Sequence, residues 1–560
     1  MINDIGWSQA KQRGRSTLTG TGGGGGGTPP PTGNTATLGA SLGTCNTRLG
    51  WTWTHNETRN TTTKNMLATA ARIQNQHLIG FGSTVNPQPG AGAAYDWTFL
   101  DATFGFPTSS TGLMSGATER CLTALGCPPH MRSPKSGQTW DPMGVRSGTQ
   151  LTSLSEYYPP NHSWFNEWGD LLAAAMARYP HVKYLQVWNE LKGFYVTTQY
   201  AGSSAIPPGS GLPSGITPLS NRWWYEGYTA MFNIIWQKVK AVRPDAFIVG
   251  PYNVLNSLAW DTSSDWANDT FPDLCQGPWG YLDKKILHTH RYFLANCTGL
   301  DALCSDVRNL TKDSGATSYY NPASIPGTPD PTNKWTTNPD GGTHGRYWKE
   351  GQTVGAWNNG QKIVDWIKWV RDLGASDPKY QRSVCDARTI PVCFAEWYAY
   401  GQRTQFKMPD PHTGNYYAEA TSSHAEETAA FAWHHIKYGI IPGVYYNMAW
   451  EPEGKVQGNV TDAGDSNPLG LWYQNGSAQS LQPTELKAVS DKLVAEFPPG
   501  TALTEVVSNV PEVIGLAHAT KVMLVSRSPT PITLTMVDPG HTIDNTQVTL
   551  AGYEVKLITR

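Results

Sequence analysis

The stretch HSWFNEWGDLLAAAMARYPHVKYLQVWNE (162–190) carries the pattern that decides the fold. Its first half repeats apolar side chains at the spacing of one helix face, namely Trp164, Phe165, Trp168, Leu171, Leu172 and Ala175. Pro180 ends this helix, because proline lacks the N–H that the next turn would need. The apolar run YLQVWNE (184–190) then predicts a buried strand, so a helix leads directly into a strand.

The same alternation continues on both sides of this stretch. Seven further runs predict strands: TLGASLG (37–43), HLIGFG (77–82), RCLTALGC (120–127), AFIVGPY (246–252), KILHTHRYF (285–293), TIPVCFAEW (389–397) and IIPGVYYNMAW (440–450). Helices are predicted between most of them, at 62–76, around 225–239, around 363–370 and near 423–438, with a last one near 484–496. Eight strands joined by helices predict an α/β fold, a (β/α)8 TIM barrel.

The two ends of the chain differ from this pattern. Residues 1–36 include a Gly run and a Pro run that cannot bury apolar surface, which predicts a flexible tether. Residues 499–560 change to short strands of period two, which predict a C-terminal β-sandwich module. The barrel pattern occupies residues 37–498 between them.

Composition excludes several classes of function. The formal net charge is −2, from 42 basic and 44 acidic residues, so no strong field attracts nucleic acid or anionic lipid. No apolar run is long enough to span a membrane, and the N-terminus shows no secretory signal. Eight cysteines are few for 560 residues. Cys297 and Cys304, or Cys385 and Cys393, are near enough in sequence to be bridged. Cys121 and Cys127 flank one predicted extended strand, which holds them about 20 Å apart and forbids a bond.

Two carboxylates stand at the ends of predicted strands. Glu190 ends YLQVWNE and Glu396 ends PVCFAE, so both follow the carboxyl edge of the sheet, where barrel active sites form. Such a pair can cleave a glycosidic bond, with one carboxyl group protonating the leaving oxygen and the other attacking the anomeric carbon. A lone glutamate at such a position would more often cap a helix or face solvent. Two on the same edge, each beside a tryptophan, favour catalysis.

These motifs resemble those of clan A glycoside hydrolases. Trp188-Asn189-Glu190 is similar to the strand-four motif of the clan, and Glu396 in FAEW to its strand-seven nucleophile. The separation of the two glutamates is long for the clan, and the 294–355 segment accounts for much of the excess. Family 39, of β-xylosidases and α-L-iduronidases, is the most similar, through segments that cover about 37–560: 95–104, 122–132, 178–195, 248–253 and 552–559.

The resemblance implies a retaining mechanism without a cofactor. Glu190 would be the acid/base and Glu396 the nucleophile, and Asn189 would hold the hydroxyl next to the anomeric carbon. His290 and Tyr292, in HTHRYF, match the His-x-Tyr that faces the nucleophile in the clan, and Trp450 matches an aromatic floor under the sugar. His130 follows the third strand and is a further candidate for substrate binding.

Alternatives accompany these assignments. His288 and His290 point to the same side of a predicted strand and could ligate a metal, but no third ligand is in register, so no metal is predicted. Trp450 could equally be an ordinary core tryptophan.

The predicted partner is a carbohydrate, either a polysaccharide or a cell-surface glycan. The Gly-rich tether resembles minor tail proteins of phages that infect actinobacteria, which implies a virion location and contact with other tail proteins through the N-terminal segment. A secreted enzyme is the alternative location. A catalytically silent glycan-binding protein is the alternative function, since a hydrolase fold can persist after its chemistry is lost.

Overall fold

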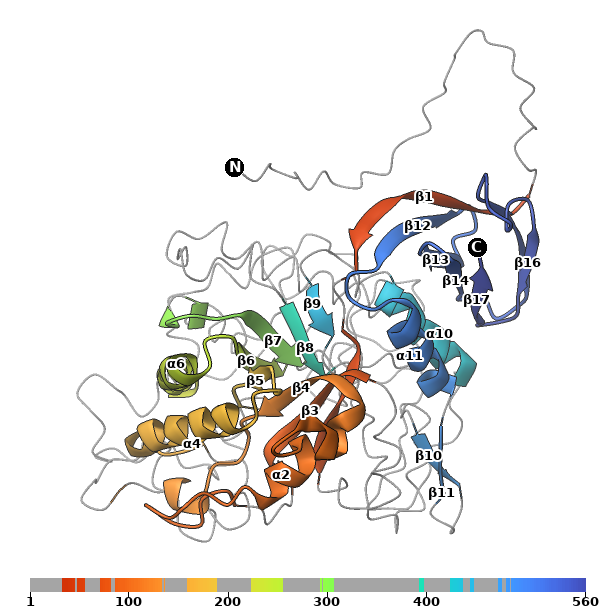
Figure 1. The fold of residues 1–560 in the computed structure, drawn as a ribbon. Helices are drawn as coiled ribbons and strands as arrows, with labels where there is room; N and C mark the ends of the chain where they lie inside the picture. The colour runs from red at the N-terminus through yellow and green to blue at the C-terminus, as the bar shows by residue number, and fades with distance from the viewer. Residues whose placement is uncertain are drawn as a thin grey trace, which may run out of the picture.

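The computed structural model contains two large sheets and the helices that pack against them (Figure 1). It describes residues 33–45, 48–55, 71–81, 86–132, 135, 159–188, 223–254, 293–294, 296–306, 392–396, 424–436, 444–447, 472–475, 480–483 and 485–560. A separate two-stranded ribbon pairs β10 (Trp472–Asn475) with β11 (Ser480–Pro483). Among the described helices, none combines the length and the apolar character that a membrane crossing requires.

The first sheet has eight strands whose order in space follows their order in the chain. Its members are β2 (Gly50–His55), β3 (Ala71–Phe81), β4 (Ala117–Thr123), β5 (Tyr184–Gln186), β6 (Phe247–Val254), β7 (Ala302–Asp306), β8 (Val392–Glu396) and β9 (Val444–Asn447). All seven pairings between neighbours are parallel. The sheet curls into a nearly closed, barrel-like arrangement (Figure 1).

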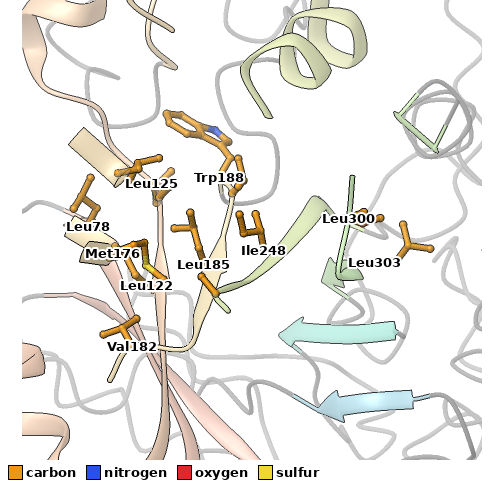
Figure 2. Packing of buried hydrophobic residues seen from close by; sticks show 14 of the residues in the cluster. Leu78, Leu122, Leu125, Met176, Val182, Leu185, Trp188, Ile248, Leu300 and Leu303 are labelled. Atoms are coloured by element: carbon orange, nitrogen blue, oxygen red, sulfur yellow. The ribbon is translucent and has the colours of Figure 1, made fainter. Parts of the chain in front are cut away.

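Side chains of these strands alternate between two separate apolar clusters, as the pleat of a strand requires. The inner cluster contains Cys121, Tyr184, Val249, Ala302, Cys304 and Cys393. The outer cluster takes the residues between them, Leu122, Leu185, Ile248 and Leu303, and continues into the helices (Figure 2). Because both faces of each strand are buried, the strands are near-continuous apolar runs in sequence.

Two long helices cover this part of the sheet. α4 (Phe165–Arg178) buries the face that its sequence predicts, with Trp168, Leu171 and Leu172 fully covered. α6 (Trp223–Val242) packs beside it and buries Tyr228, Phe232 and Ile235. A third and shorter helix, α2 (Thr98–Phe104), precedes β4.

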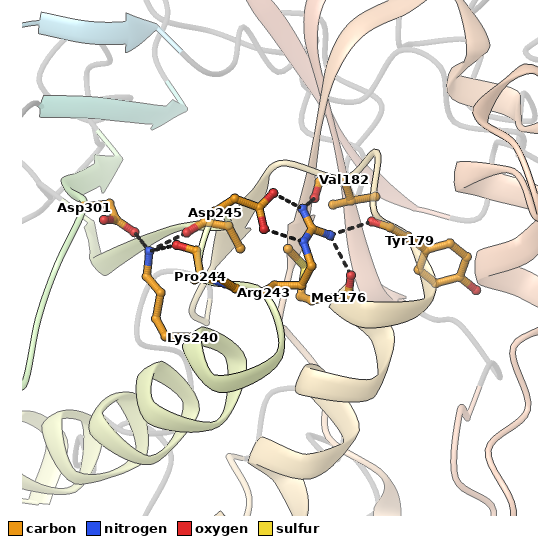
Figure 3. A network of polar contacts seen from close by, with 9 residues as sticks. Met176, Tyr179, Val182, Lys240, Arg243, Pro244, Asp245 and Asp301 are labelled. Atoms are coloured by element: carbon orange, nitrogen blue, oxygen red, sulfur yellow. Dashed lines mark hydrogen bonds and ion pairs between the residues drawn. The ribbon is translucent and has the colours of Figure 1, made fainter.

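Arg243, at the end of α6, closes the carboxyl end of α4 (Figure 3). Its Nη1 donates to the carbonyl oxygens of Met176 and Tyr179 at 2.8 and 3.2 Å, and its Nη2 donates to that of Val182 at 3.3 Å. The last carbonyls of a helix have no partner within the helix, so an arginine from a neighbouring helix supplies the donors. The same guanidinium pairs with the exposed carboxylate of Asp245.

The second sheet has seven strands in the order β16-β15-β1-β12-β13-β14-β17. They are β1 (Thr35–Thr44), β12 (Ala502–Ser508), β13 (Val513–Ala517), β14 (Lys521–Ser526), β15 (Ile532–Val537), β16 (Gln547–Leu550) and β17 (Val555–Thr559). The short strands predicted in residues 499–560 are confirmed as β12 to β17. In β14, Val522 and Leu524 face one apolar cluster, whereas Met523 and Val525 face the cluster that also holds α10 (His424–His434) and α11 (Glu485–Glu496).

The prediction that 37–43 is the first strand of the barrel sheet is wrong. These residues belong to β1, which pairs antiparallel with β12 and parallel with β15 in the second sheet. The first strand of the eight-stranded sheet is β2 instead. The chain leaves the second sheet after β1 and returns to it before β12, and these two points lie side by side. Cys45 N donates to Thr501 O at 2.8 Å, and Gly500 N donates to Cys45 O at 2.7 Å. The boundaries 1–36, 37–498 and 499–560 remain predictions.

Two other segments differ from their predictions. Residues 71–76, expected at the end of a helix, form the first half of β3. Phe293, expected to end a strand, lies in a short helical segment, and β7 at 302–306 is the sixth strand of the sheet. Residues 71–76 pair with β4 and residues 302–306 pair with β6, and this pairing decides their extended conformation.

Candidate active site

Parallel strands bring their carboxyl ends to one edge of the eight-stranded sheet. Glu396 is the last residue of β8, and its backbone is paired in register with Asp306, the last residue of β7. Trp188 follows β5 at the same edge, immediately before Asn189 and Glu190 in the sequence. Among the predicted site residues, Asn189, Glu190, His290, Tyr292 and Trp450 lie outside the described residues.

Trp188 has an unusual backbone for so large a residue. Its φ is 70°, in the left-handed region, and its side chain is fully buried. The left-handed conformation costs a non-glycine residue about 1–2 kcal/mol, so the surrounding structure must stabilise it. Its indole packs edge-on against Trp168 of α4, with ring centroids 6.4 Å apart and an interplanar angle of 77°.

The left-handed conformation of Trp188 interrupts the alternation of side chains between the two faces of β5. Tyr184 faces the inner cluster and Leu185 the outer one, yet Val187 and Trp188 both belong to the outer cluster. A regular strand would direct residues 186 and 188 to the same face. The chain therefore changes direction at Trp188, directly before the predicted acid/base motif. The Trp188-Asn189-Glu190 motif carries no sequence signal for this conformation, because nothing local favours a left-handed tryptophan.

A line of polar groups crosses the inside of the sheet below Trp188. Cys393 Sγ donates to Cys304 Sγ at 3.4 Å, and Cys304 Sγ donates to Gln186 Oε1 at 3.6 Å. The amide nitrogen of Gln186 lies 3.5 Å from Trp188 O. Gln186 is fully buried, so these contacts satisfy an amide that could not otherwise be placed in an apolar interior. Gln186 is a residue that the sequence analysis did not consider.

The six described cysteines, Cys45, Cys121, Cys127, Cys297, Cys304 and Cys393, are all buried and form no disulfide bond with one another. The possible bridge between Cys297 and Cys304 is therefore absent, and Cys385 lies outside the described residues. Burial raises the pKa of Cys121 well above its ordinary value, with the neighbouring Cys393 adding to the effect. Within the described ranges, no three His, Cys, Asp or Glu side chains are grouped so as to hold a metal ion.

His130 lies on the 3-10 turn η4 (Pro129–Arg132), just beyond the carboxyl end of β4. Its ring stands edge-on to Trp164, with centroids 5.2 Å apart, and neither ring nitrogen has a hydrogen-bond partner among the described residues. Burial lowers the pKa of His130, so the imidazole is neutral at pH 7. Lys135 covers the same indole at 4.6 Å and pairs with Glu167. His130 is thus placed on the edge of the sheet where Glu396 lies.

The fold of this chain is similar to the folds of several solved structures. The chain is similar to a conserved exported protein from Bacteroides fragilis, with a TM-score of 0.51 at 8% identity, over 94% of this chain and 100% of the other. The two chains share a fold. At this identity the likeness concerns the fold alone.

Two glycoside hydrolases of known structure match with lower TM-scores. A GH39 enzyme from Xanthomonas axonopodis pv. citri matches with a TM-score of 0.44 at 13% identity, over 91% of this chain and 77% of the other. The catalytic domain of GH30 xylanase C from Talaromyces cellulolyticus matches with a TM-score of 0.42 at 12% identity, over 94% and 97%. No protein-family model and no curated protein sequence matches the chain.

Proposed function

We propose that this protein is a retaining glycoside hydrolase built on a (β/α)8 barrel with a C-terminal β-sandwich module. The observation that supports it best is the shared edge: Glu396 ends β8, and Trp188-Asn189-Glu190 follows β5 in a sheet whose strands are all parallel. Carboxyl groups that follow strands of one parallel sheet gather at one end of it, as two-carboxylate hydrolysis requires.

In the proposed reaction Glu396 and Glu190 act in two steps. Ionised Glu396 attacks the anomeric carbon, the glycosidic C–O bond breaks, and Glu190 gives its proton to the leaving oxygen. Water then attacks the same carbon, Glu190 takes a proton from it, and the bond to Glu396 breaks. Retaining enzymes hold the two carboxyl groups about 5–5.5 Å apart. Asn189, His290, Tyr292, Trp450 and His130 are the proposed sugar-binding residues.

The proposed substrate is a polysaccharide or a cell-surface glycan. A tail-associated role in a phage that degrades host wall glycan is part of the proposal, and it is supported by the Gly-rich sequence of residues 1–36. Gly33 lies beside Asn509, the residue that follows β12, because Asn509 Nδ2 donates to Gly33 O at 2.9 Å. Immunogold labelling of virions tests this location, and unlabelled virions would contradict it.

Turnover of a panel of 4-nitrophenyl glycosides and wall glycans tests the enzymatic proposal. We expect activity in the wild type, none in Glu396→Ala, and rescue of Glu396→Ala by azide, which replaces the missing nucleophile. Glu190→Gln should slow turnover by about 10²–10⁴-fold, the usual contribution of general acid catalysis. Glu505→Gln, an exposed glutamate of β12, is the matched control and should retain full activity.

The competing function, a silent glycan-binding protein, gives a different result. It predicts no turnover by any variant and equal glycan affinity for the wild type, Glu396→Ala and Glu190→Gln.

A further inference from the structure

Tyr228 of α6 reaches the turn that precedes the proposed acid/base. Its side chain is fully buried, and its hydroxyl donates to Val187 O at 2.9 Å. Phe232 and Phe293 pack against its ring, with centroids 6.2 and 5.7 Å away, so the ring has a fixed position in the core. Val187 O belongs to the peptide unit that leads into Trp188.

Gly250 of β6 makes room for this hydroxyl. A Cβ atom at position 250 would lie 2.5 Å from the Tyr228 oxygen, closer than real contacts allow, and 3.0 Å from the Phe232 ring, a tight contact. The strand next to β5 therefore lacks a side chain where the tyrosine passes. This gives a physical reason for a glycine in the middle of a buried strand.

Hydrogen bonds on both sides fix the backbone up to Trp188. Ala124 N donates to Gln186 O at 2.8 Å, and Val187 N donates to Val249 O at 3.0 Å. These two bonds extend the pairing of β5 with β4 and β6 by one residue each. The Tyr228 hydroxyl binds the next acceptor along the chain, at the point where the φ of Trp188 becomes 70°. The left-handed turn is thus held from the helix layer through Tyr228, in addition to the contact that the Gln186 amide of β5 makes with Trp188 O.

We propose that Tyr228 is a positioning residue for the proposed general acid. Through Val187 O it fixes the left-handed turn at Trp188, and so the direction in which the chain continues to Asn189 and Glu190. The inference rests on the proposed function, since it assigns Tyr228 to the acid step of that reaction. A misplacement of about 1 Å can cost about 10²-fold in rate, so a hydroxyl outside the site can control the chemistry.

Tyr228→Phe tests this inference through the leaving group. A phenyl glycoside needs a proton from the acid as the bond breaks, whereas a 2,4-dinitrophenyl glycoside releases a stable phenolate without one. We expect kcat/KM to fall about tenfold or more for the phenyl glycoside and much less for the dinitrophenyl glycoside, the pattern that Glu190→Gln shows more strongly. Tyr184→Phe is the matched control, because its buried hydroxyl donates to Glu119 Oε2 at 2.7 Å, away from Trp188.

Three outcomes decide the result. If the wild type is active and Tyr228→Phe loses kcat/KM equally on both glycosides, or on neither, the role of Tyr228 is overturned while the proposed function stands. An active Tyr184→Phe that shows the same leaving-group dependence would also overturn it. A wild type that cleaves no glycoside of the panel would overturn the proposed function and this inference together. If Tyr228→Phe does not fold, Gly250→Ala displaces the same hydroxyl from the other side and should give the same dependence on leaving group.

Discussion

The Sγ atoms of Cys304 and Cys393 lie 3.4 Å apart, on residues that β7 and β8 place directly opposite each other. Parallel strands that carry cysteines at matched positions bring two thiols into contact inside the sheet. Both side chains are fully buried, which excludes solvent from the pair.

We predict that the six described cysteines resist thiol reagents in the native protein. Burial disfavours the thiolate that reacts, and it raises the pKa of Cys127 to about 12. Brief treatment with iodoacetamide, followed by peptide mass spectrometry, should show labels at none of the six before denaturation and at all six in guanidinium. Native labelling at Cys304 or Cys393 would show that the inside of the sheet opens to solvent.

Arg243→Met should lower the free energy of unfolding by about 2–4 kcal/mol, because three buried carbonyls, in the last turn of α4 and just beyond it, lose their donor. Urea unfolding followed by tryptophan fluorescence measures the change. Asp245→Asn is the control, since it removes the exposed partner of the same guanidinium and should cost less than about 1 kcal/mol. Equal losses in both variants would assign the stability to the ion pair instead.

His435 should make the protein less stable in acid. It is fully buried at the end of α10, and desolvation lowers its pKa from 6.5 to about 4. The unfolded chain therefore binds this proton more readily, so stability is complete above pH 6.5 and falls as the pH drops from 6.5 to 4. The loss is on the order of 3 kcal/mol. Thermal unfolding between pH 7 and 4 should show a shallower decline for His435→Phe, which keeps the contact with Phe431; parallel curves would contradict this.

Gly250→Ala should destabilise the protein by about 1–3 kcal/mol, because the added methyl group overlaps the Tyr228 hydroxyl in a packed core. Gly90→Ala adds the same group where no atom lies within 4 Å and is the matched control. Differential scanning calorimetry should show a lower Tm for Gly250→Ala only. An unchanged Tm would mean that α6 can shift to accommodate the methyl group.

Local pattern predicted the parts of the fold whose signal lies within a few residues. α4 and α6 carry apolar faces, and β14 alternates between two buried faces, so their sequences determine them. Residues 37–43 have no such signal. Their Thr, Ser and Gly residues suit either sheet, and the strand that decides is β12, near the other end of the chain.

The same distinction applies to the site. The position of Glu396 at a strand end follows from the buried run before it, and this part of the prediction agrees with β8. The conformation of Trp188 could not be predicted, because it depends on Trp168 from the preceding helix and on Tyr228 from the following one. Likewise, the room for Tyr228 depends on a glycine in a third element, β6.

In the chain, the eight-stranded sheet lies between β1 and β12, so it is inserted between two neighbouring strands of the second sheet, and Cys45 is hydrogen-bonded to residues 500 and 501 where the chain leaves and returns. Its two connections enter and leave at one point, so the inserted part has adjacent ends, the geometry that tolerates excision and circular permutation. A fragment cut at residue 499 would separate β1 from its neighbours on both sides. New termini are better placed within the inserted part, where they leave the hydrogen bonds of Cys45 with residues 500 and 501 intact.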